Sequence, residues 1–309
     1  MPHPRIGLAL GSGAARGWAH IGVLHALADA GITPDIVCGT SMGALVGGVH
    51  LSGHLDILED WARGLTKFGV ISQLDFTVAG GGMIGGRRLI RMLERYLADV
   101  RVEGLPLPFT CVATDLLTGH EVWLNEGPLI DALRASFSLP GIFAPVRHNG
   151  RWLVDGALVN PLPVSVCQAL GAQVVIAVNL HADLIGRART PGSNLPRIAG
   201  FDLDEELPEV RRQGIAGLPS MLLQLFGREN SGPSLFGVMV QSLNIMQDRI
   251  TRSRLAGEPP DVAINPRVGH VGMLEFHRAA ELIDEGRAAT ERMLPELRDA
   301  IALYASVTG

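Results

Sequence analysis

Two short apolar runs near the N-terminus, each followed by a turn and a helical pattern, place the strongest constraint on the fold of this chain. Residues 5–10 form an apolar run that ends in glycine, which is typical of a buried strand. A helical pattern over 18–30 follows, and Gly31 is placed to cap that helix at its C-terminus. Residues 35–38 indicate a second strand and 42–51 a second helix. This β-α-β-α alternation predicts a mostly parallel sheet covered by helices.

The rest of the chain continues with strands and helices at short intervals. Asn149-Gly150, between two alternating segments, predicts a β-hairpin with a type I′ turn whose second arm leads into Asp155. Residues 79–86 predict a glycine-rich loop, and residues 183–233, rich in proline, glycine and charge, predict a mobile excursion. Further strands are expected at 108–113, 122–124, 173–179 and 261–265, and further helices at 87–97, 131–138, 163–170, 235–255 and 275–302.

The length and composition of the chain fit one large domain. With 309 residues, 47% of them hydrophobic, the chain can bury a large core, and we expect one α/β hydrolase-type domain over 1–309. Within it, 5–182 carries the motifs, 183–257 is the mobile and partly helical excursion, and 258–309 supplies the last strand and the C-terminal helix. A net charge of −5 without basic runs disfavours nucleic acid as a partner.

Cysteine usage and the lack of long apolar stretches indicate the compartment. Cys38, Cys111 and Cys167 form no C-x-x-C pair, which favours a reducing compartment over a disulfide framework. The N-terminal apolar run of about five residues is too short for a signal-peptide core. No stretch approaches the ~18 apolar residues of a membrane span. These features predict a cytoplasmic protein that can also contact the inner membrane peripherally.

The segment GTSMG around Ser41 stands where a strand meets a helix. This is the context of a nucleophile elbow, in which a serine sits at a strained turn. Gly39 and Gly43 occupy positions where side chains would clash, because strand and helix pass close together. The helix N-terminus also brings backbone N–H groups near developing negative charge. The pattern predicts a nucleophilic serine, although a tight β-α turn with an incidental serine has the same sequence.

A second glycine-containing loop, GSGAARG over 11–17, follows the first strand and opens a helix. It lacks the spacing of the dinucleotide fingerprint because Arg16 occupies the third glycine position, and the second strand does not end in an acidic residue. Successive amides in a tight turn instead favour an anion, which beside an elbow serine is the oxyanion of acyl transfer. Arg16 either fixes the loop or holds a substrate headgroup. The candidate main-chain donors are Gly11, Ser12, Gly13 and Ala14.

A nucleophilic serine needs a general base, and the sequence offers two arrangements. Asp155 ends a hairpin arm and precedes Gly156-Ala157, a turn that can aim the carboxylate at the carboxyl edge of the sheet. The same segment is also typical of a structural Asx turn. An aspartate becomes a usable base where partial desolvation raises its pKa from about 3.9. His270 follows the last expected strand, so the order Ser41, Asp155, His270 would also match an α/β-hydrolase triad.

These motifs together resemble the patatin-like phospholipase family, especially its small bacterial members. GSGAARG, GTSMG and DGA at Asp155 agree in order and spacing, and ATDLLTG and RASFSLPGIFAPV support them, so the resemblance covers residues 5–182. It implies a three-layer α/β/α sandwich and a Ser41–Asp155 dyad without a catalytic histidine, with the glycine loop as the oxyanion hole. The family's loop usually has three consecutive glycines before the basic residue, where this chain has Ser-Gly-Ala. The supporting motif residues are Arg16, Gly17, Gly39, Gly43, Gly156 and Ala157.

The resemblance implies hydrolysis of lipid carboxylic esters, such as those of phospholipids and lysophospholipids, with Ser41 carrying the acyl group. Residues 218–226 and an apolar face over 235–250 fit either a lid or lipid-facing surface or ordinary core packing. The sequence contains no metal-binding motif, so neither a metal nor a cofactor is predicted. A triad esterase that uses His270, and a non-catalytic regulatory protein that retains the fold, are the alternatives. The apolar face comprises Leu235, Met239, Leu243, Met246 and Ile250.

Overall fold

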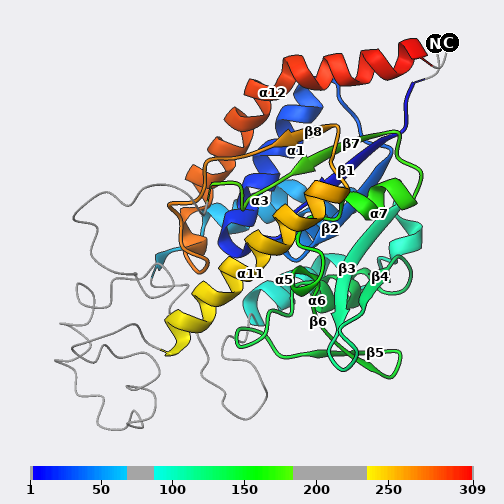
Figure 1. Ribbon diagram of the computed structural model, residues 1–309. Helices are drawn as coiled ribbons and strands as arrows, with labels where there is room; N and C mark the ends of the chain where they lie inside the picture. The colour runs from blue at the N-terminus through cyan, green and yellow to red at the C-terminus, as the bar shows by residue number, and fades with distance from the viewer. Residues whose placement is uncertain (1–2, 68–86, 184–234, 308–309) are drawn as a thin grey trace, which may run out of the picture.

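The computed structural model describes residues 3–67, 87–183 and 235–307, and within these ranges a sheet of eight strands forms the centre of the molecule (Figure 1). Its longest continuous part is parallel, as the β-α-β-α alternation predicts. In spatial order the parallel strands are β8 (Val262–Ile264), β7 (Val174–Val178), β1 (Ile6–Leu10), β2 (Ile36–Thr40) and β3 (Phe109–Asp115).

Antiparallel strands extend the sheet at β3. The strands β5 (Val146–His148) and β6 (Arg151–Asp155) form the expected hairpin. Asn149 and Gly150 at its turn have φ values of 46° and 79°, which confirms the type I′ prediction, since both central residues of that turn need positive φ. Both β6 and β4 (Glu121–Leu124) pair antiparallel with β3.

Helices cover both faces of the sheet, which confirms the three-layer α/β/α arrangement (Figure 1). Side chains alternate between the faces: Leu8 and Leu10 of β1 enter the larger hydrophobic cluster, while Ala9 enters a smaller one with Cys167 and Leu255. The helices are α1 (Ala19–Asp29), α2 (Met42–Leu51), α3 (Leu55–Arg63), α5 (Arg87–Leu97), α6 (Leu129–Ser136), α7 (Val164–Ala169), α11 (Leu235–Gly257) and α12 (Ala279–Val307), with 3-10 turns η1 (Ala14–Trp18), η3 (Val102–Gly104), η4 (Gly156–Leu158) and η5 (Phe276–Arg278).

The expected elements within the described residues are present, with shifted ends. The first expected helix, over 18–30, is present as α1, and the 3-10 turn η1 precedes it in the glycine loop; Gly31 has the positive φ of 70° that a C-cap glycine takes. The loop at 79–86, the segment 218–226 and most of the 183–233 excursion lie outside the described residues. Among the helices that are described, none combines the length and apolarity needed to cross a membrane.

The apolar face expected over 235–250 is neither wholly buried nor wholly exposed, since Leu243 belongs to a buried cluster. Met246 is half exposed, and Ile250 is only partly buried. The helix instead turns a stripe of mixed character inward, because its polar members meet buried polar groups of the site described below. The buried residues of α11 are Val240, Leu243, Asn244, Gln247, Asp248 and Thr251.

The helices α1 and α12 pack backbone to backbone through two glycines. A Cβ atom at Gly22 would meet the carbonyl oxygen of Ile283, and one at Gly286 would meet that of Ala19. No side chain can stand at this crossing without separating the helices. The glycine pair therefore sets how closely α12 packs on the layer beside β1.

We expect Gly22→Ala to lower the free energy of unfolding by about 1–3 kcal/mol, because the added methyl must push the two helices apart. Gly257→Ala, at the end of α11, is the matched control, since a Cβ atom there meets nothing within 4 Å. Urea denaturation followed by circular dichroism measures both variants. Equal stability of the two variants would contradict the backbone contact.

Candidate active site

Ser41 occupies the sharp turn between β2 and α2. Its φ is 57°, a left-handed value that is strained for a residue with a side chain, as the elbow pattern predicts. The Ser41 amide donates to Ser136 Oγ at 2.9 Å, and Ser136 Oγ donates to the Val112 carbonyl at 2.6 Å. Ser136 thus holds the strained turn against β3. No sequence pattern predicts this role, although Ser136 lies within the RASFSLPG stretch.

The glycines on either side of Ser41 stand where atoms of other segments approach closely. A Cβ atom at Gly39 would lie 2.5 Å from the backbone nitrogen of Ala44, and one at Gly43 would meet the carbonyl oxygen of Leu10. The steric reason predicted for both glycines is confirmed. Gly17 and Gly156 also stand at close approaches. A Cβ atom at Gly17 would meet Met42, and one at Gly156 would meet the Val112 carbonyl.

Strands β2 and β6 end against the same edge of β3. Thr40 of β2 is paired with Val112, and Asp155 of β6 is paired with the next residue, Ala113. β4 pairs with both Val112 and Ala113 and therefore occupies the opposite edge. Ser41, the residue after Thr40, therefore lies beside the end of β6. Ser41 Oγ donates a hydrogen bond of 2.6 Å to Asp155 Oδ2, across 114 positions of sequence.

The Asp155 carboxylate is enclosed by protein. Burial raises its pKa to about 7, against the opposing effect of two donors, Ser41 Oγ and the Ala157 amide. The Ala157 amide donates to Oδ1 at 2.8 Å, so Asp155 also makes the structural Asx turn that the sequence left open. Thr114 Oγ1 donates to the Asp155 carbonyl at 2.8 Å and holds the strand end in place. The carboxylate is therefore both fixed and poised to change charge near neutral pH.

His270 does not join this pair. Its Nε2 lies 2.6 Å from Glu281 Oε1 on α12, and its side chain is half exposed. In a triad an imidazole would stand between serine and aspartate, but here the two side chains bond directly. The geometry therefore does not form the Ser41–Asp155–His270 arrangement.

The glycine loop offers fewer free amides than the sequence suggests. The Gly11 amide donates to the Val178 carbonyl at 3.2 Å and the Ser12 amide to the Pro161 carbonyl at 2.8 Å, so neither faces an oxyanion. Among the described residues, the amides of Gly13 and Ala14 have no backbone acceptor. Ala14 has a φ of 47°, which bends the loop at this point. The four expected donors are thus reduced to Gly13 and Ala14.

Arg16 is buried and braces the loop from inside. Its Nε donates to the Val271 carbonyl at 2.8 Å and its Nη1 to Asn244 Oδ1 of α11 at 3.2 Å. Burial lowers its pKa to about 10, while the charges of Asp183 and Glu275 act in the opposite direction. Of the two predicted roles, the contacts match fixing the loop, since the enclosed guanidinium is held by protein acceptors.

Two buried histidines extend this brace. Burial lowers the pKa of His20 to about 4 and that of His181 to about 3, so both are neutral at physiological pH. His20 Nε2 lies 2.7 Å from the Gly11 carbonyl, and His181 Nε2 lies 3.0 Å from Gln247 Oε1. The polar residues Asn244 and Gln247 of α11 therefore bond the buried side chains of Arg16 and His181. A stripe of polar residues at helical spacing was the available sequence signal for this packing.

An apolar cluster, separate from the main core, packs against the glycine loop and against the turn that follows Asp155. Ala14 of the loop and Leu158, which follows Ala157, both contact it. Its buried members are Leu139, Ile142, Val240, Leu243, Met273 and Leu274.

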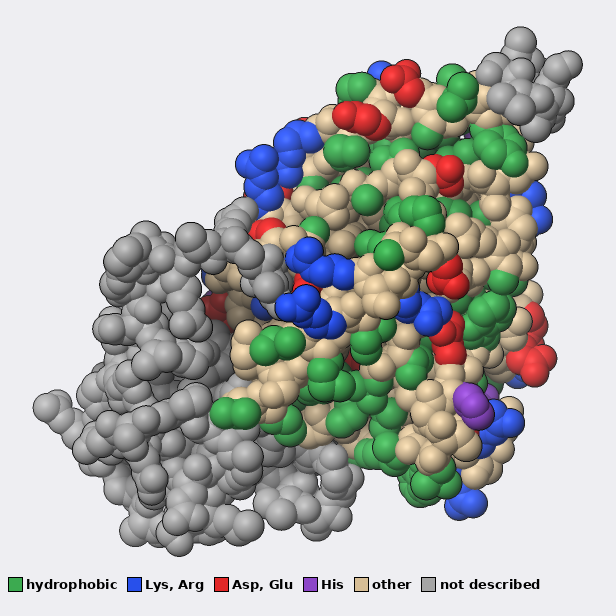
Figure 2. Space-filling model, viewed as in Figure 1, with side chains coloured by type: hydrophobic (Ala, Val, Ile, Leu, Met, Phe, Trp, Pro, Cys, Tyr) green, Lys and Arg blue, Asp and Glu red, His purple; other side chains and the backbone are tan. Residues whose placement is uncertain are grey.

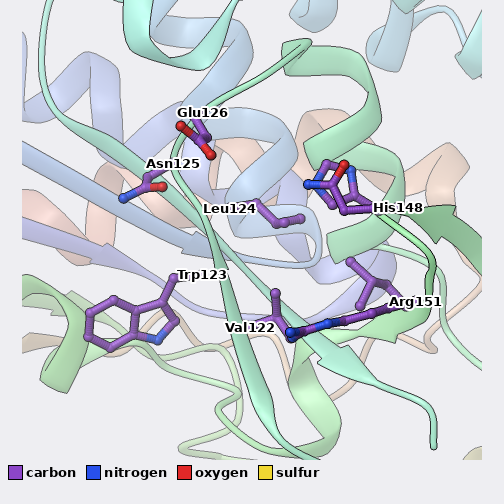
Figure 3. Close-up of a pocket in the computed structure, with 9 residues that line it drawn as sticks. Val122, Trp123, Leu124, Asn125, Glu126, His148 and Arg151 are labelled. Carbon is purple, nitrogen blue, oxygen red and sulfur yellow. The ribbon is translucent and has the colours of Figure 1, made fainter.

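A pocket of ≈ 260 Å³ lies at β4 and the β5–β6 hairpin (Figure 3). Figure 3 shows the Arg151 side chain reaching toward Val122, with Glu126 and His148 farther along the pocket. Neither Ser41 nor Asp155 lines it, so it is separate from the pair. In the described part of the chain, no cluster of three or more His, Cys, Asp or Glu side chains is arranged to hold a metal ion.

Comparisons with known proteins place these motifs in a family. Residues 8–167 match the family model described as patatin-like phospholipase. An uncharacterized NTE family protein of Mycobacterium tuberculosis is 35% identical, over 99% of this chain and 96% of that protein. Lysophospholipase NTE1 of Pyricularia oryzae is 27% identical over 96% of this chain, which spans 19% of that protein. Among solved structures, VipD from Legionella pneumophila matches with a TM-score of 0.49 and 12% identity, covering 95% of this chain and 67% of VipD.

We expect Asn244→Leu to lower the free energy of unfolding by about 1–3 kcal/mol, because the substitution keeps the branched side-chain skeleton but leaves a buried guanidinium N–H without its acceptor. Asn265→Leu is the matched control, since Asn265 is exposed. Urea denaturation measures both. Stability of Asn244→Leu equal to that of the control would show that Arg16 does not depend on α11.

Proposed function

The chain belongs to the patatin-like phospholipase family, and from this premise we propose that it is a serine acyl hydrolase that cleaves carboxylic esters of lipids. The observation that carries the proposal is the direct bond of 2.6 Å between Ser41 Oγ and Asp155 Oδ2. It joins a hydroxyl on a strained elbow to a buried carboxylate, which is the pairing that a nucleophile and its general base require. The reaction class is hydrolysis through a covalent acyl-enzyme.

In the proposed reaction, Asp155 accepts the proton of Ser41 as Oγ attacks the ester carbonyl carbon. The carbonyl oxygen becomes an oxyanion, to which the amides of Gly13 and Ala14 donate; these amides have no backbone acceptor within the described chain. The intermediate collapses, the C–O bond to the alcohol breaks, and the alcohol leaves with the proton from Asp155. Asp155 then accepts a proton from water as that water attacks the acyl-enzyme, and returns it to Ser41 Oγ as the fatty acid departs.

Burial is what makes an aspartate suitable as the base. An ordinary carboxylate is too weak to take a proton from a hydroxyl with useful frequency at neutral pH. The raised pKa of Asp155, about 7, brings its basicity close to the working pH. Histidine supplies the same property in other serine hydrolases through its intrinsic pKa.

The proposed substrate class rests on the surroundings of the glycine loop and on the family. The cluster that packs against Ala14 and Leu158 puts apolar side chains next to the proposed oxyanion loop, which favours a fatty-acyl chain over a polar acyl group. Among relatives, the Pyricularia oryzae protein is named a lysophospholipase. These two observations support phospholipid and lysophospholipid esters as substrates.

We expect Ser41→Ala to reduce hydrolysis of a chromogenic fatty-acyl ester by about 10³-fold or more, and Asp155→Asn to cause a comparable loss. His270→Ala is the matched control and should keep activity close to wild type, because its imidazole pairs with Glu281. Initial rates measure all three, with circular dichroism to show that each variant is folded.

A fluorophosphonate probe gives an independent readout of the same assignment. It should label the wild-type protein and not Ser41→Ala. Loss of activity in His270→Ala would support the Ser41–Asp155–His270 triad instead. Failure of the folded wild type to react at Ser41 would favour a non-catalytic protein.

The pH dependence of kcat/KM should follow the titration of Asp155. The base must be ionised, so log(kcat/KM) should rise with pH and level off above about 7, where the buried carboxylate is deprotonated. The same profile is expected for His270→Ala. A rate already independent of pH between about 5 and 8 would mean that the catalytic carboxylate titrates near its ordinary value of about 3.9.

A further inference from the structure

The outward face of α11 has no role in the proposed chemistry, and it carries apolar side chains where a surface helix is normally polar. Val238, Ile245 and Met246 are 44, 43 and 49% exposed. Their spacing of seven and eight positions puts them on one side of the helix. The inward side holds Asn244 and Gln247, which contact Arg16 and His181. A helix that buries polar groups and exposes apolar ones is typical of an interaction surface.

A second apolar group lies at the carboxyl edge of the sheet, where β3 and β6 meet the turn to β4. Leu116, Leu117 and Trp152 are 49, 82 and 45% exposed. The Leu116 amide donates to the Trp152 carbonyl at 2.8 Å, so these residues lie side by side. Figure 2 shows hydrophobic side chains extending from α11 toward the part of the molecule that holds β5 and β6 in Figure 1. Arg254 Nη2 of α11 donates to Glu121 Oε2 at 3.1 Å, which brings α11 beside β4, the strand into which the Leu116–Leu117 turn leads.

Arginines stand around this apolar face. Arg147 is paired with Trp152 across the hairpin, and Arg249 and Arg252 follow Ile245 along α11. Within the described chain, neither Arg147 nor Arg249 has an acidic partner, while Arg252 bonds Asp248 at 2.9 Å. The chain as a whole carries a net charge of −5, so this positive rim is local to the face. Apolar side chains with a cationic rim complement a surface of acyl chains under anionic headgroups.

We propose that the interfacial face, defined as Val238, Ile245 and Met246 of α11 together with Leu116, Leu117 and Trp152, docks on the surface of an anionic lipid aggregate. The proposal rests on the proposed function to this extent: Ser41 is only 7% exposed, so a lipid ester must leave its aggregate to reach it. α11 carries the interfacial face on its outside, while Val240 and Leu243 on its inside belong to the apolar cluster. Docking there would bring the lipid surface onto the outer side of a helix whose inner side packs in that cluster.

The test is sedimentation of the full chain carrying Ser41→Ala with sucrose-loaded vesicles of phosphatidylcholine, with and without phosphatidylglycerol. We expect binding that requires the anionic lipid. Ile245→Asp/Met246→Asp should weaken it at least tenfold, and Arg147→Gln/Arg249→Gln should weaken it by about fivefold for each arginine. Leu303→Asp is the matched control, because Leu303 is 68% exposed but lies near the C-terminal end of α12.

A soluble short-chain ester separates this proposal from the proposed function. Ile245→Asp/Met246→Asp with Ser41 intact should hydrolyse that ester at the wild-type rate and lose turnover only of vesicle lipid. Absent vesicle binding beside intact turnover of the soluble ester would overturn the docking face and leave the hydrolase standing. Vesicle binding without turnover of either substrate would overturn the hydrolase and leave the docking face standing. Concentration-dependent dimerisation abolished by Ile245→Asp would show that a second copy, and not lipid, covers the face.

Discussion

The site depends on one constraint of sheet topology: β2 and β6 end on the same edge of β3. Thr40 and Asp155 are paired with consecutive residues of β3, so Ser41, which follows β2, lies beside the end of β6. The hydroxyl of Ser41 and the carboxylate of Asp155 become hydrogen-bonded neighbours as a result. Ser136 then couples the Ser41 amide to the Val112 carbonyl on the same strand. Strand register and the strained turn at Ser41 together set the distance between the two groups.

This arrangement costs stability in two ways. Ser41 takes a positive φ, which is unfavourable by about 1–3 kcal/mol for a residue of its kind. Asp155 has a folded pKa of about 7, above the ordinary value of 3.8, so the native state binds the proton more tightly than the unfolded chain does. The contribution of Asp155 to stability is therefore full below pH 3.8 and is lost as pH rises through about 7. The ionised base that catalysis needs is the less stable form, and the surrounding core and brace must offset it.

Local patterns in the sequence predicted what short-range physics controls. The turn at Asn149-Gly150, the elbow at Ser41 and the cap at Gly31 each need a backbone conformation that only a few residues accept. The free amides of the glycine loop could not be predicted, because the acceptors of Gly11 and Ser12, at Val178 and Pro161, lie about half the chain away. The orientation of α11 could not be predicted for a related reason. Its inward polar side chains Asn244 and Gln247 meet Arg16 and His181, which lie 228 and 66 positions away in the sequence.

The polar groups on the inward side of α11 and the apolar side chains on its outward side are linked. An apolar inner stripe would leave Arg16 and His181 without their acceptors, and each unsatisfied buried group costs about 1–3 kcal/mol. Asn244 and Gln247 therefore face the protein beside Val240 and Leu243, while Val238, Ile245 and Met246 lie on the surface. Asn244 and Ile245 are consecutive, so the side chain that holds Arg16 and one that faces lipid in our proposal belong to the same helical turn. A lipid surface that covers Ile245 would stabilise the orientation of α11 that also positions the loop carrying Gly13 and Ala14.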